Sequence, residues 1–192
     1  MKRFLLILIA GLAVITSGAK IPQKEVQSFE GALRFGTNYP LGSYKSMTGK
    51  MGINMGLDFR FNYDDMPLDF GIAIDLAGTS YNFHKPDYNF HDDTYTTLGI
   101  TYCSNYNFRQ GYKVNPYVGV GLGYAYNYYN YHSKEIDKNS FIFVAKVGVE
   151  LLYHIRFEAS VILVCRKYFN CVNLTFGVVI GGRPRKSNFD KK

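Results

Sequence analysis

The chain has 192 residues, which is enough for one domain of ordinary size. It carries 22 basic and 15 acidic residues, a formal net charge of +7, and three cysteines. Three cysteines are too few, and odd in number, for a framework of disulfides to hold the fold together. The basic residues are dispersed along the chain, which argues against nucleic-acid binding and favours contact with an anionic surface such as lipopolysaccharide.

Residues 1–19 have the three-part pattern of a secretory signal peptide. Lys2 and Arg3 form a positive start, an uncharged apolar run follows over 4–15, and the segment ends on small residues at Ala19. The apolar run is shorter than the ~20 residues that a membrane-spanning helix needs. We therefore predict export with cleavage near Ala19, a mature domain over 20–182, and a basic C-terminal tail over 183–192.

From residue 29 onward, bulky apolar residues alternate with small or polar ones. The alternation recurs in eight segments, at 29–39, 51–61, 68–77, 98–108, 118–127, 141–151, 157–166 and 172–181. In the second segment, Met55, Leu57 and Phe59 alternate with Gly56 and Asp58. Side chains that alternate in this way lie on opposite faces of a β-strand. The pattern therefore predicts eight strands.

The composition of the two faces indicates which one meets lipid. The bulky face carries almost no polar atoms, while the other mixes glycine and alanine with scattered charges. The lumen of an eight-stranded barrel is only wide enough for side chains, so small residues fit inside it and the bulky face fits lipid. About ten residues, rising ~3.3 Å each and tilted by roughly 40°, span the ~25 Å apolar band of such barrels. We predict an all-β fold, an eight-stranded antiparallel up-and-down transmembrane β-barrel.

Connections of two lengths alternate between the predicted strands. Compact links at 64–67, 109–115 and 154–156 alternate with longer, more polar links at 41–50, 84–93 and 132–140, and the link at 167–170 is short. Short periplasmic turns and longer external loops are typical of outer-membrane barrels. Tyrosines gather near the strand ends, as in an interfacial aromatic girdle. The tyrosine-rich stretch at 124–131 could continue this girdle into a loop or extend above the membrane as a sheet edge that binds other proteins.

The Asn-Pro-Tyr-Val-Gly-Val-Gly-Leu-Gly-Tyr segment at 115–124 resembles a strand motif of the small outer-membrane β-barrel family that includes OmpA-type and OmpX-type barrels. The signal peptide and the eight-segment plan are similar to that family along nearly the whole chain. The resemblance implies an outer-membrane barrel and says little about function. Such barrels often end on an aromatic residue, whereas here Ile180-Gly181-Gly182 precedes the basic tail.

Charged residues on the predicted inward face are the first candidate site. They face one another across a narrow lumen: Glu30, Arg34, Asp58, Arg60, Asp69, Asp75, Lys146, Glu150, Glu158 and Arg166. One interpretation is a selective or gated pore. The other is a plugged lumen in which opposite charges pair, because an unpaired buried charge costs several kcal/mol. Eight strands leave little open cross-section, which favours the plug.

Residues with catalytic or metal-binding chemistry fall mainly in the predicted connections. A hydrolase needs a nucleophile and a base within hydrogen-bond reach, and the candidates on one external edge are Ser80, His84, His91, Asp92 and Asp93. Their spacing matches no catalytic motif, and His84, Asp87 and His91 form no diagnostic metal-binding set. We therefore expect neither an enzyme nor a bound metal or other cofactor.

The three cysteines are placed by the same alternation. Cys103 is predicted to face the lumen, where a small residue fits. Cys165 and Cys171 flank the link at 167–170 but fall on opposite faces, so a disulfide between them would require a bulge or a wider loop.

The sequence thus favours a monomeric barrel in the outer membrane with a structural or surface-interaction role. That role would be membrane integrity, contact with lipopolysaccharide, or binding of a partner protein through the external loops. The alternatives that stay open are a narrow porin-like channel and a lipid A-modifying enzyme. No nucleic-acid partner is expected.

Overall fold

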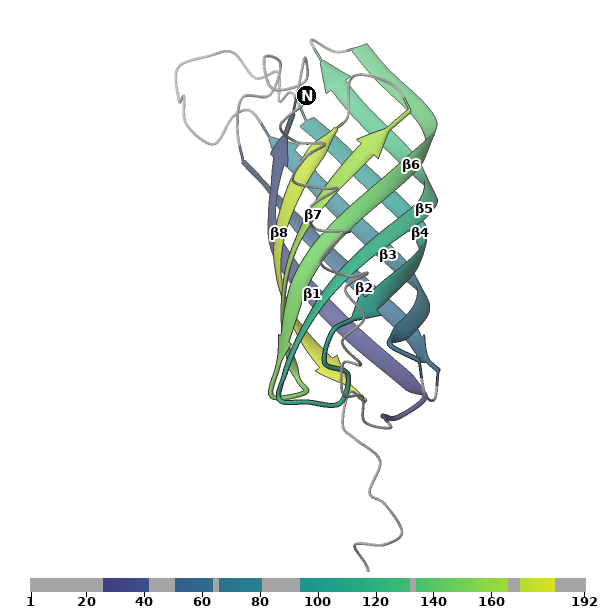
Figure 1. Ribbon diagram of the computed structural model, residues 1–192. Helices are drawn as coiled ribbons and strands as arrows, with labels where there is room; N and C mark the ends of the chain where they lie inside the picture. The colour runs from purple at the N-terminus through teal and green to yellow at the C-terminus, as the bar shows by residue number, and fades with distance from the viewer. Residues whose placement is uncertain are drawn as a thin grey trace, which may run out of the picture.

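The computed structural model describes residues 26–41, 51–63, 66–80, 94–131, 134–165 and 170–181. These residues form eight strands: β1 (Phe29–Pro40), β2 (Gly52–Asn62), β3 (Leu68–Ser80), β4 (Thr94–Asn107), β5 (Val114–Tyr131), β6 (Lys134–Leu151), β7 (Ile155–Val164) and β8 (Cys171–Ile180). Each strand pairs antiparallel with the next, and β8 pairs with β1, so the sheet closes into a barrel (Figure 1). The predicted fold class is confirmed. Among the described residues, no helix is long and apolar enough to cross a membrane.

The closing pair of strands runs in unbroken register from Gly31 opposite Ile180 to Pro40 opposite Cys171. A sheet edge in hydrocarbon would leave backbone N–H and C=O groups without partners, at several kcal/mol each. Closure removes that edge. The first and last strands, far apart in sequence, are therefore neighbours in space.

The barrel exposes its apolar residues and buries its polar ones. Leu122, Phe141 and Ile180 are 68%, 69% and 76% exposed, whereas Asn54 and Asp69 are fully buried. This is the inverse of a protein in water. The wall therefore suits lipid, and the predicted outward apolar face is confirmed.

The lumen has two halves of different character. Toward the end that carries the longer connections, buried apolar residues cluster inside the barrel: Tyr95, Ala125, Ile142, Val144, Ile162, Val164 and Cys171. Toward the end with the short turns, the inward residues are mainly charged or amide side chains. The charges are thus concentrated in the half of the lumen nearer the short turns.

The external loop predicted at 132–140 is wrong. The structure instead continues β5 and β6 as one hairpin, in which Asn127 is opposite Lys138 and Tyr131 is opposite Lys134. The outward alternation of Tyr124, Tyr126 and Tyr128 supports this longer strand. The hairpin stands at the upper end of the barrel in Figure 1. Of the two possibilities for the stretch at 124–131, the structure shows the extended sheet, with a paired strand on either side of β5 as far as Asn130.

The compact link predicted at 154–156 is also wrong in its extent. The turn occupies 152–154, and β7 already begins at Ile155, so Arg156 is a strand residue whose side chain is fully buried. Similarly, β5 begins at Val114 rather than at the end of the link predicted over 109–115. In both places the alternation extends closer to the turn than the polar character of the residues suggests.

Several expectations fall outside the described residues. These are the signal peptide over 1–19, the tail over 183–192, and almost all of the links at 41–50, 84–93 and 167–170. The described strands span 29–180, within the predicted domain of 20–182.

A first prediction concerns how the cost of a charged residue on the outer face depends on its depth in the membrane. Leu122 lies in the middle of β5, opposite Tyr102 and Phe143, while Ile180 ends β8. Leu122→Arg should lower the free energy of unfolding in lipid vesicles by about 2–4 kcal/mol, and Ile180→Arg by only about 0–1 kcal/mol, because arginine is costly at the bilayer midplane and tolerated near its surface. Urea titration measures both. Equal losses at the two positions would contradict a membrane-spanning band centred near Leu122.

Candidate functional site

The candidate site is a group of charged side chains that enter the lumen from five strands. Because residues two apart on a strand share a face, β1, β2, β3, β6 and β7 each contribute two of them. They are Glu30 and Arg34, Asp58 and Arg60, Asp69 and Asp75, Lys146 and Glu150, and Arg156 and Glu158. Asp75, the most exposed member in an ion pair, has a side chain that is 16% exposed. We refer to this group as the lumen charge network.

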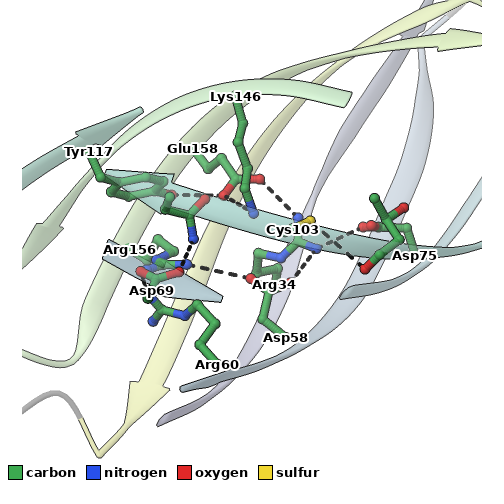
Figure 2. A network of polar contacts seen from close by, with 12 residues as sticks. Arg34, Asp58, Arg60, Asp69, Asp75, Cys103, Tyr117, Lys146, Arg156 and Glu158 are labelled. Atoms are coloured by element: carbon green, nitrogen blue, oxygen red, sulfur yellow. Dashed lines mark hydrogen bonds and ion pairs between the residues drawn. The ribbon is translucent and has the colours of Figure 1, made fainter. Parts of the chain in front are cut away.

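Arg34 is the centre of the upper layer of the network. Its Nη2 atom lies 2.9 Å from Asp58 Oδ1 and 3.0 Å from Asp75 Oδ1, and its Nη1 atom lies 3.1 Å from Glu158 Oε1. Figure 2 shows the guanidinium among these three carboxylates. One side chain of β1 thus ties together β2, β3 and β7. Glu158 also accepts a hydrogen bond from the Tyr117 hydroxyl at 2.8 Å and lies 3.8 Å from Lys146 Nζ.

Arg60 is the centre of the lower layer. It lies 2.7 Å from Glu30 Oε2 and 3.5 Å from both Asp69 Oδ2 and Glu150 Oε2. Arg156 joins the two layers, with Nη2 3.2 Å from Glu150 Oε2 and Nη1 3.5 Å from Asp58 Oδ2. The Arg156 guanidinium also lies over the Tyr117 ring, 4.5 Å from its centre. The guanidinium groups are therefore shared between carboxylates of several strands, as the several N–H donors of arginine allow.

Glycines make room for these large side chains. A Cβ atom at Gly56 would lie 2.6 Å from Asp75 Oδ1 and 2.9 Å from Arg34 Nη2. A Cβ atom at Gly148 would collide with the Tyr117 hydroxyl. The inward glycines that alternate with charges along the strands are thus the spaces into which the network fits.

Amide side chains surround the lower layer at the short-turn end. Asp69 accepts hydrogen bonds from Asn105 at 2.5 Å and Asn107 at 2.9 Å. Gln110, from the turn between β4 and β5, donates to Asn62 Oδ1 at 3.2 Å and is buried. Because Gln110 comes from the turn and not from a strand, it covers the lumen from below.

The voids described beside the charged groups are small. Two small voids border the network, one of about 10 Å³ at the short-turn end and one of about 20 Å³ toward the apolar half. A void of this size holds roughly one water molecule. In the described lumen, the charged groups therefore meet mainly one another.

The other residues singled out in the sequence are partly described. Arg166, His84, His91, Asp87, Asp92 and Asp93 lie outside the described residues, and of Ser80 only the backbone is described. Cys103 and Cys171 are buried in the lumen and Cys165 is exposed, so Cys165 and Cys171 do lie on opposite faces. Within the described ranges, no group of three His, Cys, Asp or Glu side chains is arranged to hold a metal ion.

Sequence reasoning missed two members of the site. Arg156 was assigned to a turn, although it shares the inward face with Glu158 and Ser160 by strict alternation. Tyr117 was not assigned a face, although Val118 and Val120 face outward and place it inside. In both cases the period-2 rule was a sufficient signal, and the residue type obscured it, because an arginine beside a turn and a tyrosine near a strand end normally indicate the membrane interface.

Removing one charged partner from this network should lower the stability of the barrel. Arg156→Met should lower the free energy of unfolding by about 3–5 kcal/mol, because Glu150 and Asp58 keep their buried charges and lose a partner. The double variant Arg156→Met/Glu150→Gln should recover part of the loss. Urea titration in lipid vesicles measures both variants, with Lys138→Met, at the half-buried outer end of β6, as the control. A loss for Arg156→Met no larger than that of the control would contradict the inference.

Two solved structures have a similar fold. Neisserial surface protein A, from Neisseria, is 15% identical to this chain with a TM-score of 0.58, and the match covers 82% of this chain and 99% of that protein. Ail, the attachment invasion locus protein of Yersinia pestis, solved in complex with the heparin analogue sucrose octasulfate, is 15% identical with a TM-score of 0.51, covering 80% and 99%. At this identity the likeness shows the fold alone.

Sequence comparison identifies the family. No curated protein matches the chain in sequence. The family model described as "Outer membrane protein beta-barrel domain" matches residues 6–161, which include β1 to β6 and most of β7. Together with the closed barrel, its apolar wall and its charged lumen, this match shows that the chain belongs to the outer-membrane protein β-barrel family.

Proposed function

We propose that this protein is an outer-membrane barrel with a closed lumen that supports contacts at the cell surface and does not conduct solutes. The observation that carries the proposal is the lumen charge network. Arg34 contacts carboxylates of three other strands at 2.9–3.1 Å, and Arg156 connects them to the lower layer. The network acts as an internal brace, and the surface at the outer end carries the interaction.

A conducting path would have to pass between these ion pairs. The network crosses the lumen in two layers, Gln110 covers it at the short-turn end, and the bordering voids are about the size of one water molecule. Above it, the lumen is filled by apolar side chains such as Ile142 and Val164 and by amide side chains that bond to one another, as Asn38 does to Asn173 at 2.9 Å. The narrow channel is therefore the less favoured of the two functions considered for the lumen.

Planar-bilayer recordings test the closed lumen. The wild-type barrel should show no steady conductance steps. Arg34→Ala should introduce them, because it removes the side chain that joins three carboxylates. Lys138→Ala, at the outer rim, is the control and should behave like the wild type. Steady steps of the same size in the wild-type and Arg34→Ala proteins would show that the lumen conducts, and the proposal would fail.

The outer end offers a contact surface in the β5–β6 hairpin. The β6–β7 register begins only at Ile142 opposite Val164, whereas β6 pairs with β5 as far as Lys134. The Cys165 N–H, just after β7, donates to the Phe141 carbonyl at 3.1 Å, and β6 continues from there to Lys134 in pairing with β5, so the hairpin extends past the end of β7. Strand edges and neighbouring aromatic side chains are common sites of protein and glycan contact. Without Lys2 and Arg3 of the predicted signal peptide the chain has 20 basic and 15 acidic residues, and this net charge of +5 favours an anionic partner such as lipopolysaccharide, the anionic surface at this end of an outer-membrane protein.

Shortening the hairpin separates a surface role from a structural one. Asn127 and Lys138 are paired, so replacing 128–137 by Asn-Gly keeps the register and closes the strands with a favoured two-residue turn. The shortened barrel should still show a shift in gel migration between unboiled and boiled samples, and should retain less lipopolysaccharide after detergent extraction. Unchanged retention of lipopolysaccharide by the folded, shortened barrel would show that the hairpin is not the contact surface.

A further inference from the structure

Two bulky residues in the β6–β7 turn have a backbone conformation that such residues rarely adopt. The φ angle is +53° at Leu152 and +66° at Tyr153. The His154 N–H donates to the Leu151 carbonyl at 3.1 Å, which closes a four-residue turn. Positive φ at both central positions makes this a type I′ turn, which favours Asn, Asp or Gly because a larger side chain is strained there. Leu-Tyr is therefore an unfavourable pair for this turn.

The surrounding structure holds the turn in place through its backbone and the imidazole. The Leu152 N–H donates to the Lys113 carbonyl at 2.6 Å, so the turn lies directly beside the β4–β5 turn. His154 Nδ1 lies 3.0 Å from the Val179 carbonyl oxygen of β8. The Leu152 side chain, in contrast, is 58% exposed. Packing inside the barrel thus does not explain why a leucine occupies a strained position.

The neighbouring turn adds exposed positive charge. Arg109 and Lys113 flank the β4–β5 turn and are both exposed, and the Arg109 guanidinium lies 5.0 Å from the centre of the Tyr112 ring. In the part of this end that the structure describes, these are the exposed charged side chains, and both are cationic. The acidic pair Asp64 and Asp65 of the β2–β3 link lies outside the described residues. Exposed apolar and basic side chains and half-buried tyrosines are thus brought together by two adjacent turns.

The position of this surface indicates its partner. In outer-membrane barrels the short turns face the periplasm, directly below the apolar band. An exposed leucine beside tyrosines and cations suits the boundary between acyl chains and headgroups, where tyrosine and basic residues are favoured. Strained backbone that packing does not require is characteristic of binding sites.

We propose that the paired β4–β5 and β6–β7 turns bind the phosphate headgroup of an anionic phospholipid in the periplasmic leaflet. Arg109 and Lys113 contact the phosphate, and Leu152 and Tyr153 enter the acyl boundary beside it. The type I′ turn is retained with two unsuitable residues because it directs these side chains into the membrane. The inference concerns the end opposite the proposed surface contact and does not depend on it.

Lipid selectivity tests the basic part of the site. The full chain is folded into phosphatidylcholine nanodiscs that contain spin-labelled phosphatidylglycerol or spin-labelled phosphatidylcholine, and the motionally restricted fraction of each label is measured. Wild type should select phosphatidylglycerol. Arg109→Gln and Lys113→Gln should each lower its relative association about fivefold. Arg109→Lys, which keeps the positive charge at the same exposed position, is the matched control and should keep the selectivity. Absence of selectivity in the wild type, or an unchanged association in either turn variant, would overturn the proposal.

The turn itself is tested by giving it the residues that its geometry favours. Leu152→Asn/Tyr153→Gly should raise the urea midpoint of unfolding, because the strain is relieved, and should lower phosphatidylglycerol association. A rise in the midpoint with unchanged association would mean that the two side chains have no role in lipid binding, and the proposal would be overturned. Should the double variant fail to fold, Arg109→Gln and Lys113→Gln still decide, because they change exposed side chains only.

Discussion

The rest of the structure depends on the exclusion of bulk water from the lumen of the barrel. Because the outer face must be apolar to lie in lipid, every charged side chain that the strands carry in this zone points inward, where bulk water is excluded. A charge in such a place needs a partner of opposite sign, and Arg34 finds three of them, Asp58, Asp75 and Glu158. The glycines at 56 and 148 follow from the same requirement, because the large paired side chains occupy the space that a Cβ would fill.

The network also explains why the two ends of the barrel differ. Its layers occupy the middle and lower lumen, where Glu150, Arg156 and Glu158 lie close to the β6–β7 turn along the chain. The upper lumen holds apolar residues such as Ile142 and Val164 together with uncharged amides such as Asn127. The strands can therefore be extended at the upper end, as in the β5–β6 hairpin, without changing the paired charges below. The paired charges inside the lumen stabilise the barrel, whereas the length of the strands at its ends can vary.

Much of this fold could be predicted from alternation, because side-chain direction in a strand has a period of two. That rule placed Arg34, Asp58 and Asp75 on the inward face and Leu57 and Phe59 on the outward face, as the structure has them. The rule could not predict which opposite charges pair with one another. Arg34 and Glu158 are separated by most of the chain, and their contact depends on the closure of β8 onto β1 and on the stagger of the strands. Arg156 and Tyr117 were missed for another reason: their residue types suggested a turn or an interface, and this outweighed a periodicity that was correct.

The exceptions to local rules are informative because the wall obeys those rules so closely. Along the strands, residue type, face and burial agree, and similarity of fold at 15% identity shows that many sequences satisfy such a pattern. A wall that many sequences can form carries little information about a particular role. The β6–β7 turn is different, because Leu152 and Tyr153 occupy positions whose positive φ favours Asn or Gly. A residue that opposes its own backbone conformation, and whose side chain is exposed, is best explained by a contact outside the protein, so specific function in this barrel is to be sought at its two ends.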